Sequence, residues 1–354
     1  MKISNKRINT VKVVTPNKND IKVIVQGQEP FKDETIRHTK FYNENTHSRC
    51  ASRVLIEYVG GKAAFEPAVQ WLIREKINLK IVDAVVIPFT GSGTEFLNVA
   101  PLIKGEVKNV VLNDINPSIT NLLKIIRDDR TALIREVEKI QKDKTIVLGD
   151  SAITLKEHKE YQRGLQHELN LLEKDNILGI RRAALFIVLM NTTYGGNYSW
   201  KDGCSKISIA CDIKKYERSN VVEKIKMYSY FMSQFNVIIE TMDFADLFKK
   251  YDDESSLFLI DAPYLKQDAN VLVSTEVTYG FPDFPHQLCI DMTTQLKGQF
   301  IYHNYRNIAQ EKIFSKFNHI NMIEYHKPIH NAKSADGKKK MSVEIIYFSN
   351  KVEA

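Results

Sequence analysis

The stretch IVDAVVIPFTGSGTEFLN, residues 81–98, decides the fold. Its first seven residues form a short apolar run typical of a buried strand, residues 88–94 form a glycine-containing turn, and a helix is expected from Glu95. A second strand is predicted at 107–114 and an amphipathic helix at 116–142. Strands that alternate with helices in this order predict a parallel, doubly wound α/β sheet.

Upstream of this unit, residues 11–14 and 21–25 flank the turn-rich hexapeptide TPNKND and predict a β-hairpin. Polar residues dominate 26–52, which is interpreted as a linker or arm. A helix is expected over 63–79, and Trp71 on it is interpreted as a core residue. One face of this helix is apolar and carries Phe65, Val69, Leu72, Ile73 and Ile77.

Downstream, the alternation of strands and helices is interrupted between residues 150 and 240. A charged helix is expected over 155–178, an apolar helix over 181–190, and a hairpin turn at Lys201-Asp202-Gly203. Strand patterns then return at 256–261, 299–303, 320–326 and 342–349. The sheet domain is therefore predicted to contain an insertion.

Composition limits the class of protein. The 354 residues are 43% hydrophobic and 26% charged, which is ordinary for a soluble globular chain. No apolar stretch approaches the ~18 residues of a membrane span, and the N-terminus has no signal core, so a cytoplasmic location is expected. The four cysteines are interpreted as free thiols.

Charge points to a polyanionic partner. The net charge is +7, and residues 1–52 hold ten Lys or Arg against five Asp or Glu. Further basic excess lies in 201–230 and in a lysine-rich stretch near the C-terminus. Such islands are typical of nucleic-acid-binding proteins, although a solvated lysine-rich surface remains the alternative.

The glycine turn predicts a cofactor site. Glycines at 91 and 93 let the backbone approach a ligand, and the next helix offers free N–H groups at its start. Asp114 ends the following strand, 23 residues after Gly91, at a position suited to a ribose diol. The turn matches neither the dinucleotide nor the nucleotide-triphosphate motif, so we expect another nucleoside-containing cofactor.

A second candidate site is Asp261-Ala262-Pro263-Tyr264, at the end of strand 256–261. The Asp261 carboxylate and the Ala262 carbonyl can both accept hydrogen bonds from an amine, and Tyr264 can stack on a flat ring. The tetrapeptide therefore favours recognition of an aromatic amine. An ordinary exit from a strand remains the alternative for this tetrapeptide alone.

Six elements, in this order, resemble the Dam-like class of N6-adenine DNA methyltransferases over residues 53–348. They are YVGGK from Tyr58, PFTGSGTEFLN from Pro88, LNDINPSITNL from Leu112, RRAALFIVL from Arg181, Asp243-Phe244, and DAPY, where the family has DPPY. The resemblance implies a Rossmann-like, S-adenosylmethionine-dependent domain with an inserted, mainly helical DNA target-recognition domain. The ranges expected are 1–52 for a basic extension with a hairpin, 53–130 for cofactor binding, 131–240 for target recognition, and 241–354 for catalysis.

The resemblance also implies roles for individual residues. Catalysis is expected of Asp261, Ala262, Pro263 and Tyr264. Cofactor binding is expected of Tyr58, Gly61, Lys62, Pro88, Phe89, Thr90, Gly91, Ser92, Gly93, Asp114, Ile115, Asp243, Phe244 and Asp261. DNA contacts are expected of Tyr194, Asn197, Tyr198, Trp200, Lys201, Lys206, Lys338 and Lys339. The expected partners are double-stranded DNA, S-adenosylmethionine and a cognate restriction endonuclease, with the chain a monomer or weak dimer and no membrane or metal involved.

The expected reaction moves a methyl group from S-adenosylmethionine to the N6 amine of a flipped-out adenine in duplex DNA. Two departures from the family stand out. Ala262 replaces a proline, which loosens the backbone but keeps the carbonyl, and the hairpin around 198–216 lacks the pattern of GATC-specific members. Two alternatives remain. The chain could be a catalytically silent DNA-binding relative, which Ala262 leaves as an option, or an enzyme that acts on RNA or a small molecule.

Two cysteines, a histidine and a glutamate also have chemistry that could mark a site. Cys204 and Cys211 lack paired histidines, which argues against a zinc site. His303 is interpreted as a satisfied structural histidine rather than a lining of the base pocket. Glu344 is interpreted as a structural partner for a loop near the base.

Overall fold

A nine-stranded sheet forms the centre of the computed structural model, which describes residues 10–17, 20–25, 54–56, 67–78, 81–148, 155–209, 220–275, 283–333 and 339–349. Its strands are β1 (Thr10–Asn17), β2 (Asp20–Val25), β3 (Ala84–Ile87), β4 (Asn109–Asn113), β7 (Asn236–Glu240), β8 (Ser256–Ile260), β9 (Gln299–Tyr305), β10 (Ile320–Lys333) and β11 (Lys339–Ser349). The spatial order is β2-β1-β10-β11-β9-β8-β3-β4-β7.

The centre of this sheet is parallel. β3 lies between β4 and β8, and all three run in the same direction, as do β7 beyond β4 and β9 beyond β8. β11 is antiparallel to both of its neighbours, β9 and β10. β1 runs parallel to β10, and β2 pairs antiparallel with β1, as the hairpin prediction required.

The central strands are buried on both faces. In β3, Val85 and Ile87 join one hydrophobic core, whereas Val86 between them joins the other. Side chains that alternate between two cores explain why these strands read as continuous apolar runs in the sequence. A sheet of this kind needs helices on both of its faces.

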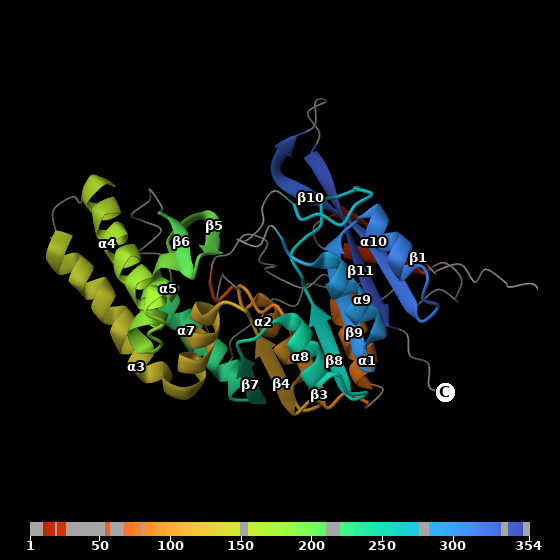
Figure 1. Ribbon diagram of the computed structural model, residues 1–354, viewed down its shortest axis with the longest axis horizontal. Coiled ribbons are helices and arrows are strands. Elements are labelled where there is room, and N and C mark those ends of the chain that lie inside the picture. Colours follow the sequence, from red (N-terminus) through yellow and green to blue (C-terminus); the bar gives the residue numbers. More distant parts are fainter. Residues whose placement is uncertain are drawn as a thin grey trace, which may run out of the picture.

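Two sets of helices cover the faces (Figure 1). One core receives side chains from α1 (Pro67–Asn78), α2 (Thr94–Ile103), α3 (Pro117–Leu148), α5 (Ile180–Asn191) and α7 (Val221–Met232). The other receives them from α8 (Phe244–Tyr251), α9 (His286–Gln295) and α10 (Ile308–Phe314). The result is a three-layered α/β/α arrangement, which confirms the predicted fold class.

A helical region lies to one side of the sheet, at the left of Figure 1. It contains the long helix α3, α4 (Leu155–Lys174), α5 and a separate hairpin of β5 (Thr193–Lys201) and β6 (Cys204–Ile209). α3 kinks at Asp129, whose carboxylate accepts from the N–H of Ala132 and so restarts the helix. Arg181 on α5 pairs with Glu136 on α3 and Glu168 on α4, and thereby holds the three helices together.

The sequence predicted most of these elements. α1 begins at Pro67, where the first helical position tolerates proline. The hairpin turn at Asp202 and Gly203 has positive φ at both residues, as an Asx-Gly turn requires. The strand β7 was not predicted. It is an edge strand of the main sheet, although it falls at the end of the range expected for the insertion.

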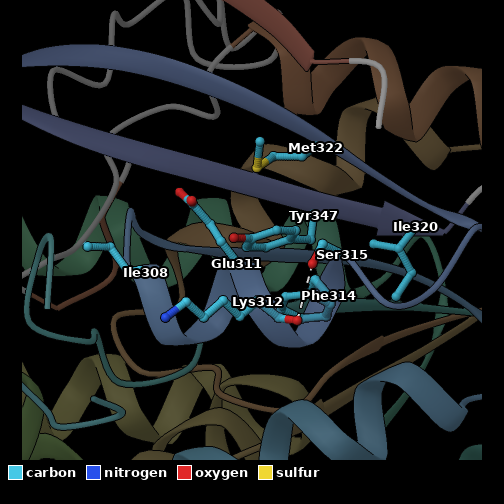
Figure 2. Close-up of a pocket in the computed structure, with 8 residues that line it drawn as sticks. All are labelled: Ile308, Glu311, Lys312, Phe314, Ser315, Ile320, Met322 and Tyr347. Carbon is cyan, nitrogen blue, oxygen red and sulfur yellow. Dashed lines mark hydrogen bonds between the residues drawn. The ribbon is translucent and has the colours of Figure 1, made fainter. Parts of the chain in front are cut away.

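A pocket of about 380 Å³ lies where α10 packs on β10 and β11 (Figure 2). Phe314 of α10 stacks on Tyr347 of β11 with ring centroids 4.1 Å apart, and Met322 of β10 also lines the pocket. None of its lining residues comes from β3, β4 or β8.

None of the described helices is long and apolar enough to cross a membrane.

Candidate active site

The candidate site lies at the carboxyl ends of β3, β4 and β8. The chain leaves β3 through α2 to β4 on one side, whereas β8 adds to the other side of β3. Such a reversal of strand order is where open α/β sheets bind their ligands. The turn 88–93, Asp114 and Asp261 therefore all emerge at one edge of the sheet.

The glycine turn is tightly constrained. Gly91 and Gly93 have φ values of +46° and +74°, which favour glycine. The N–H of Gly93 donates to the carbonyl of Thr90 (2.8 Å), and a Cβ on Gly93 would lie 2.9 Å from Cε2 of Tyr228 on α7. The turn thus depends on glycine both for its backbone conformation and for close packing.

Asp114 faces this turn. Its carboxylate accepts from the N–H of Gly91 through Oδ2 and from the N–H of Asn116 through Oδ1, both at 2.9 Å. Burial raises the pKa of Asp114 to about 6, although both backbone hydrogen bonds act to lower it. An acceptor of this kind, fixed beside a glycine turn, suits the hydroxyl groups of a ligand.

Asn113, which was not predicted as a site residue, fastens the ends of three strands together. Its amide donates to the carbonyls of Pro88 (2.9 Å) and Met242 (3.1 Å), and its oxygen accepts from the N–H of Met242 (3.1 Å). Its side chain is almost fully buried. The Asn-Asp pair at the end of a strand was the available signal, but the partners of Asn113 are distant in sequence.

An aromatic cluster stands beside the turn. The rings of Phe89, Phe244 and Phe284 lie with centroids 5.4–5.7 Å apart. Asp243 is exposed and caps α8 by accepting from the N–H of Ala245 at 2.8 Å. Phe284 was missed in the sequence because no element was predicted there.

The loop after β8 is held by β9. Ala262 is buried, whereas Asp261, Pro263 and Tyr264 are half-buried. Asn304 on β9 accepts from the N–H of Leu265 (2.8 Å) and donates to the carbonyl of Pro263 (3.4 Å). Because Asn304 is fully buried, its amide fixes the backbone on either side of Tyr264.

Tyr264 lies among other rings. Its ring packs edge-on against Tyr305, 4.6 Å between centroids, and 6.0 Å from the ring of His303. Burial raises the pKa of Tyr305, and the carboxylates of Glu344 and Asp261 raise it further. Nε2 of His303 lies 2.8 Å from Oε2 of Glu344, so this buried histidine is paired as the sequence analysis favoured.

The residues predicted to contact DNA differ in how exposed they are. Lys201 and Lys206 are exposed on the β5–β6 hairpin, and Trp200 is half-buried. Tyr198 is buried, and its hydroxyl bonds Asn116. Tyr194 and Asn197 belong to β5 and Lys339 begins β11. Their side-chain positions are not described.

Several predicted residues lie outside the described residues: Tyr58, Gly61, Lys62, Lys338, Cys211 and most of 1–52. The nearest described segment, 54–56, touches the glycine turn, because the N–H of Ile56 donates to the carbonyl of Ser92 at 3.4 Å. Ile115 is exposed next to Asp114. Within the described part of the chain, no three His, Cys, Asp or Glu side chains gather as metal ligands would.

Comparison with known proteins adds to this geometry. The profile of D12 class N6 adenine-specific DNA methyltransferases matches residues 58–327. A type II methyltransferase of Lactococcus lactis subsp. cremoris is 23% identical over 271 residues, covering 75% of this chain and 86% of that protein. A type II methyltransferase of Methanocaldococcus jannaschii is 22% identical over 228 residues, covering 64% of this chain and 74% of that protein. The range matched by the profile contains the glycine turn, Asp114 and Asp261.

Proposed function

The chain belongs to the D12 class N6 adenine-specific DNA methyltransferase family, and on this premise we propose that it transfers a methyl group from S-adenosylmethionine to the N6 amine of a flipped-out adenine in duplex DNA. The observation that carries the proposal is the emergence of Asp114 and Asp261 at one edge of the sheet, on either side of the glycine turn. This arrangement supports a cofactor and a target base that meet above β3.

The residues around the turn fit such a cofactor. Asp114 offers acceptors for a ribose diol, and the cluster of Phe89 and Phe244 beside Asp243 suits an adenine ring. The hydroxyl of Thr90 is buried and has no hydrogen-bond partner among the described residues, so a ligand group would satisfy it. When bound, this cofactor supplies a methyl group on a positively charged sulfur.

Tyr58, Gly61, Lys62 and the turn are assigned to the methionine end of the cofactor. The contact between Ile56 and Ser92 supports that assignment, because it brings the chain that leads into Tyr58 against the turn. Lys62 would then offer a cation to the methionine carboxylate.

The loop after β8 is assigned to the target base. The Asp261 carboxylate and the Ala262 carbonyl accept the two N–H groups of the amine, and Tyr264 stacks on the ring. These bonds draw the nitrogen toward tetrahedral geometry and free its lone pair. The nitrogen would accept the methyl group that the bound cofactor supplies, and its surplus proton would pass through Asp261 to solvent. Alignment and exclusion of water supply most of the acceleration.

Duplex DNA is the proposed substrate. Lys201 at the tip of the β5–β6 hairpin and Lys206 on β6 would contact phosphates, and the target base would leave the stack at a cost of a few kcal/mol. The names of the two relatives support a role in restriction-modification with a cognate endonuclease. We expect the chain to act as a monomer or weak dimer in the cytoplasm.

The test uses tritium-labelled S-adenosylmethionine and DNA from a strain without adenine methylation. The wild-type chain should label the DNA, and digestion to nucleosides should place the label in N6-methyl-2′-deoxyadenosine. Asp261→Ala should abolish labelling while the cofactor Kd changes less than twofold. Absence of label with the wild-type chain would reject the proposed activity and support the catalytically silent alternative.

A further inference from the structure

The β5–β6 hairpin is a separate two-stranded sheet. Two strands alone are marginally stable in water, so the hairpin takes its position from what it is attached to. α4 and α5 pack beside it (Figure 1). Lys201 at its tip and Lys206 on β6 are exposed. The contacts that hold the hairpin therefore decide where these two cations lie relative to the reacting centre.

The strand β5 is fastened through Tyr198. Its ring packs edge-on against Phe186 of α5, with centroids 5.9 Å apart, and 8% of the residue is exposed. The side-chain amide of Asn116 donates to the Tyr198 hydroxyl, which also lies 3.4 Å from Oγ of Ser205. A hydroxyl engaged in this way is not available to DNA.

Asn116 joins this tyrosine to Asp114, which itself bonds the glycine turn. Its own N–H donates to Oδ1 of Asp114, and its Oδ1 accepts from the N–H of Ser118 at the start of α3, both at 2.9 Å. Only 2% of Asn116 is exposed. One buried side chain thus touches the proposed ribose-binding carboxylate, the start of a helix and the hairpin.

The strand β6 is joined to the start of α3 by a separate set of hydrogen bonds. Glu173 of α4 accepts from the N–H and the hydroxyl of Ser205 and from the hydroxyl of Ser118, each at 2.6 Å. Arg182 of α5 donates to the Ser118 hydroxyl at 2.8 and 3.0 Å. β5 is therefore bonded to Asn116, immediately before α3, and β6 is joined through Glu173 to Ser118 in the first turn of α3.

Packing alone does not require this network. A contact with Phe186 alone would bury the Tyr198 ring without giving it a directional bond. Buried polar groups must keep their partners, because an unsatisfied one costs about 1–3 kcal/mol. A connected set of directional bonds therefore holds the hairpin in one position.

We propose that Tyr198 is a positioning residue whose hydroxyl fixes the β5–β6 hairpin to the segment after β4 that carries Asp114. DNA held at the hairpin tip then meets the reacting centre in one orientation. The inference rests on the proposed function, and it reassigns Tyr198 from DNA contact to placement of the DNA-contacting element.

The test is Tyr198→Phe, which keeps the ring and removes the hydroxyl. Tyr161→Phe is the matched control, because Tyr161 donates to the carbonyl of Ile140 at 2.8 Å between α4 and α3, away from the hairpin. We expect Tyr198→Phe to lower kcat/KM for sheared, unmethylated genomic DNA about tenfold, the equivalent of one buried hydrogen bond. The Kd for S-adenosylhomocysteine should change less than twofold, and Tyr161→Phe should leave both constants unchanged.

Hydrogen exchange gives a readout that does not need activity. Amides of β5 and β6 should exchange about tenfold faster in Tyr198→Phe than in the wild type, whereas those of β3 and β4 should be unchanged. Equal exchange and equal kcat/KM in Tyr198→Phe and Tyr161→Phe would overturn the inference. A wild-type chain without methyl transfer would reject the proposed function, and the exchange comparison would still decide the role of Tyr198.

Discussion

Cofactor affinity should fall below pH 6 because of Asp114. Burial raises the pKa of this carboxyl to about 6, and the ionised form is the better acceptor for ribose hydroxyls. The apparent Kd scales with the inverse of the ionised fraction, which is about 90% at pH 7 and about 9% at pH 5. The Kd should therefore rise about tenfold between pH 7 and pH 5 and stay nearly constant above pH 7.

Calorimetric titration with S-adenosylhomocysteine at half-unit steps from pH 5 to pH 8 measures this profile. The control is Asp114→Asn, which removes the titrating group, so that any slope left in the variant belongs to the ligand or to other residues. The variant should bind at least tenfold more weakly at pH 7. A wild-type slope equal to that of Asp114→Asn would refute the reasoning.

The raised pKa of Asp114 should also lower the free energy of unfolding at neutral pH. The pKa of Asp114 is higher in the folded protein than its unfolded value of 3.8. The folded protein therefore becomes less stable as the pH rises from about 4 to about 6, because the buried carboxyl must lose its proton. A shift of about two units corresponds to about 3 kcal/mol at neutral pH. Asp114→Asn loses one of the two backbone hydrogen bonds, at about 1 kcal/mol. The cofactor-free variant should therefore unfold at a higher temperature than the wild type at pH 7, and the difference should vanish near pH 4.

The remaining predictions concern the two loops. Gly93→Ala places a Cβ 2.9 Å from Tyr228 at a φ of +74°, so it should weaken cofactor binding at least tenfold by calorimetry and lower the melting temperature. Ala262→Pro should raise kcat for methyl transfer about two- to fivefold if it restores a rigid backbone there, and a loss of activity would contradict this. Asn304→Ala leaves the N–H of Leu265 without its acceptor, which should cost about 1–3 kcal/mol in denaturant unfolding. The same change should lower kcat more than tenfold with an unchanged cofactor Kd, and an unchanged kcat would exclude a role in positioning the loop.

Local patterns made the pairing of the glycine turn with Asp114 predictable. Short apolar runs marked β3 and β4, and strand ends in a parallel sheet meet at one edge. Gly91 and Asp114, which lie 23 residues apart, could therefore be paired in advance, and the structure joins them by a hydrogen bond. The family profile matches the same range of the chain.

Long-range pairing was not predictable in the same way. Asn113 bonds Met242 across 129 residues, and Asn304 bonds Leu265 across 39. An asparagine in a sequence shows what it can donate and accept, but only the fold decides which partner it meets. For the same reason the sequence could not show that the Tyr198 hydroxyl meets Asn116. The place of β11 between β9 and β10 likewise depends on tertiary packing rather than on pattern.

Methyl transfer as proposed requires Asp261 to face the sulfur of the cofactor while Asp114 holds its ribose. A crystal structure with bound S-adenosylhomocysteine tests this most directly. We predict ribose hydroxyls on the Asp114 carboxylate, the adenine against Phe244, and the thioether sulfur turned toward Asp261. A cofactor seated elsewhere, or an Asp261 side chain directed to the opposite side of the sheet from the sulfur, would contradict the account.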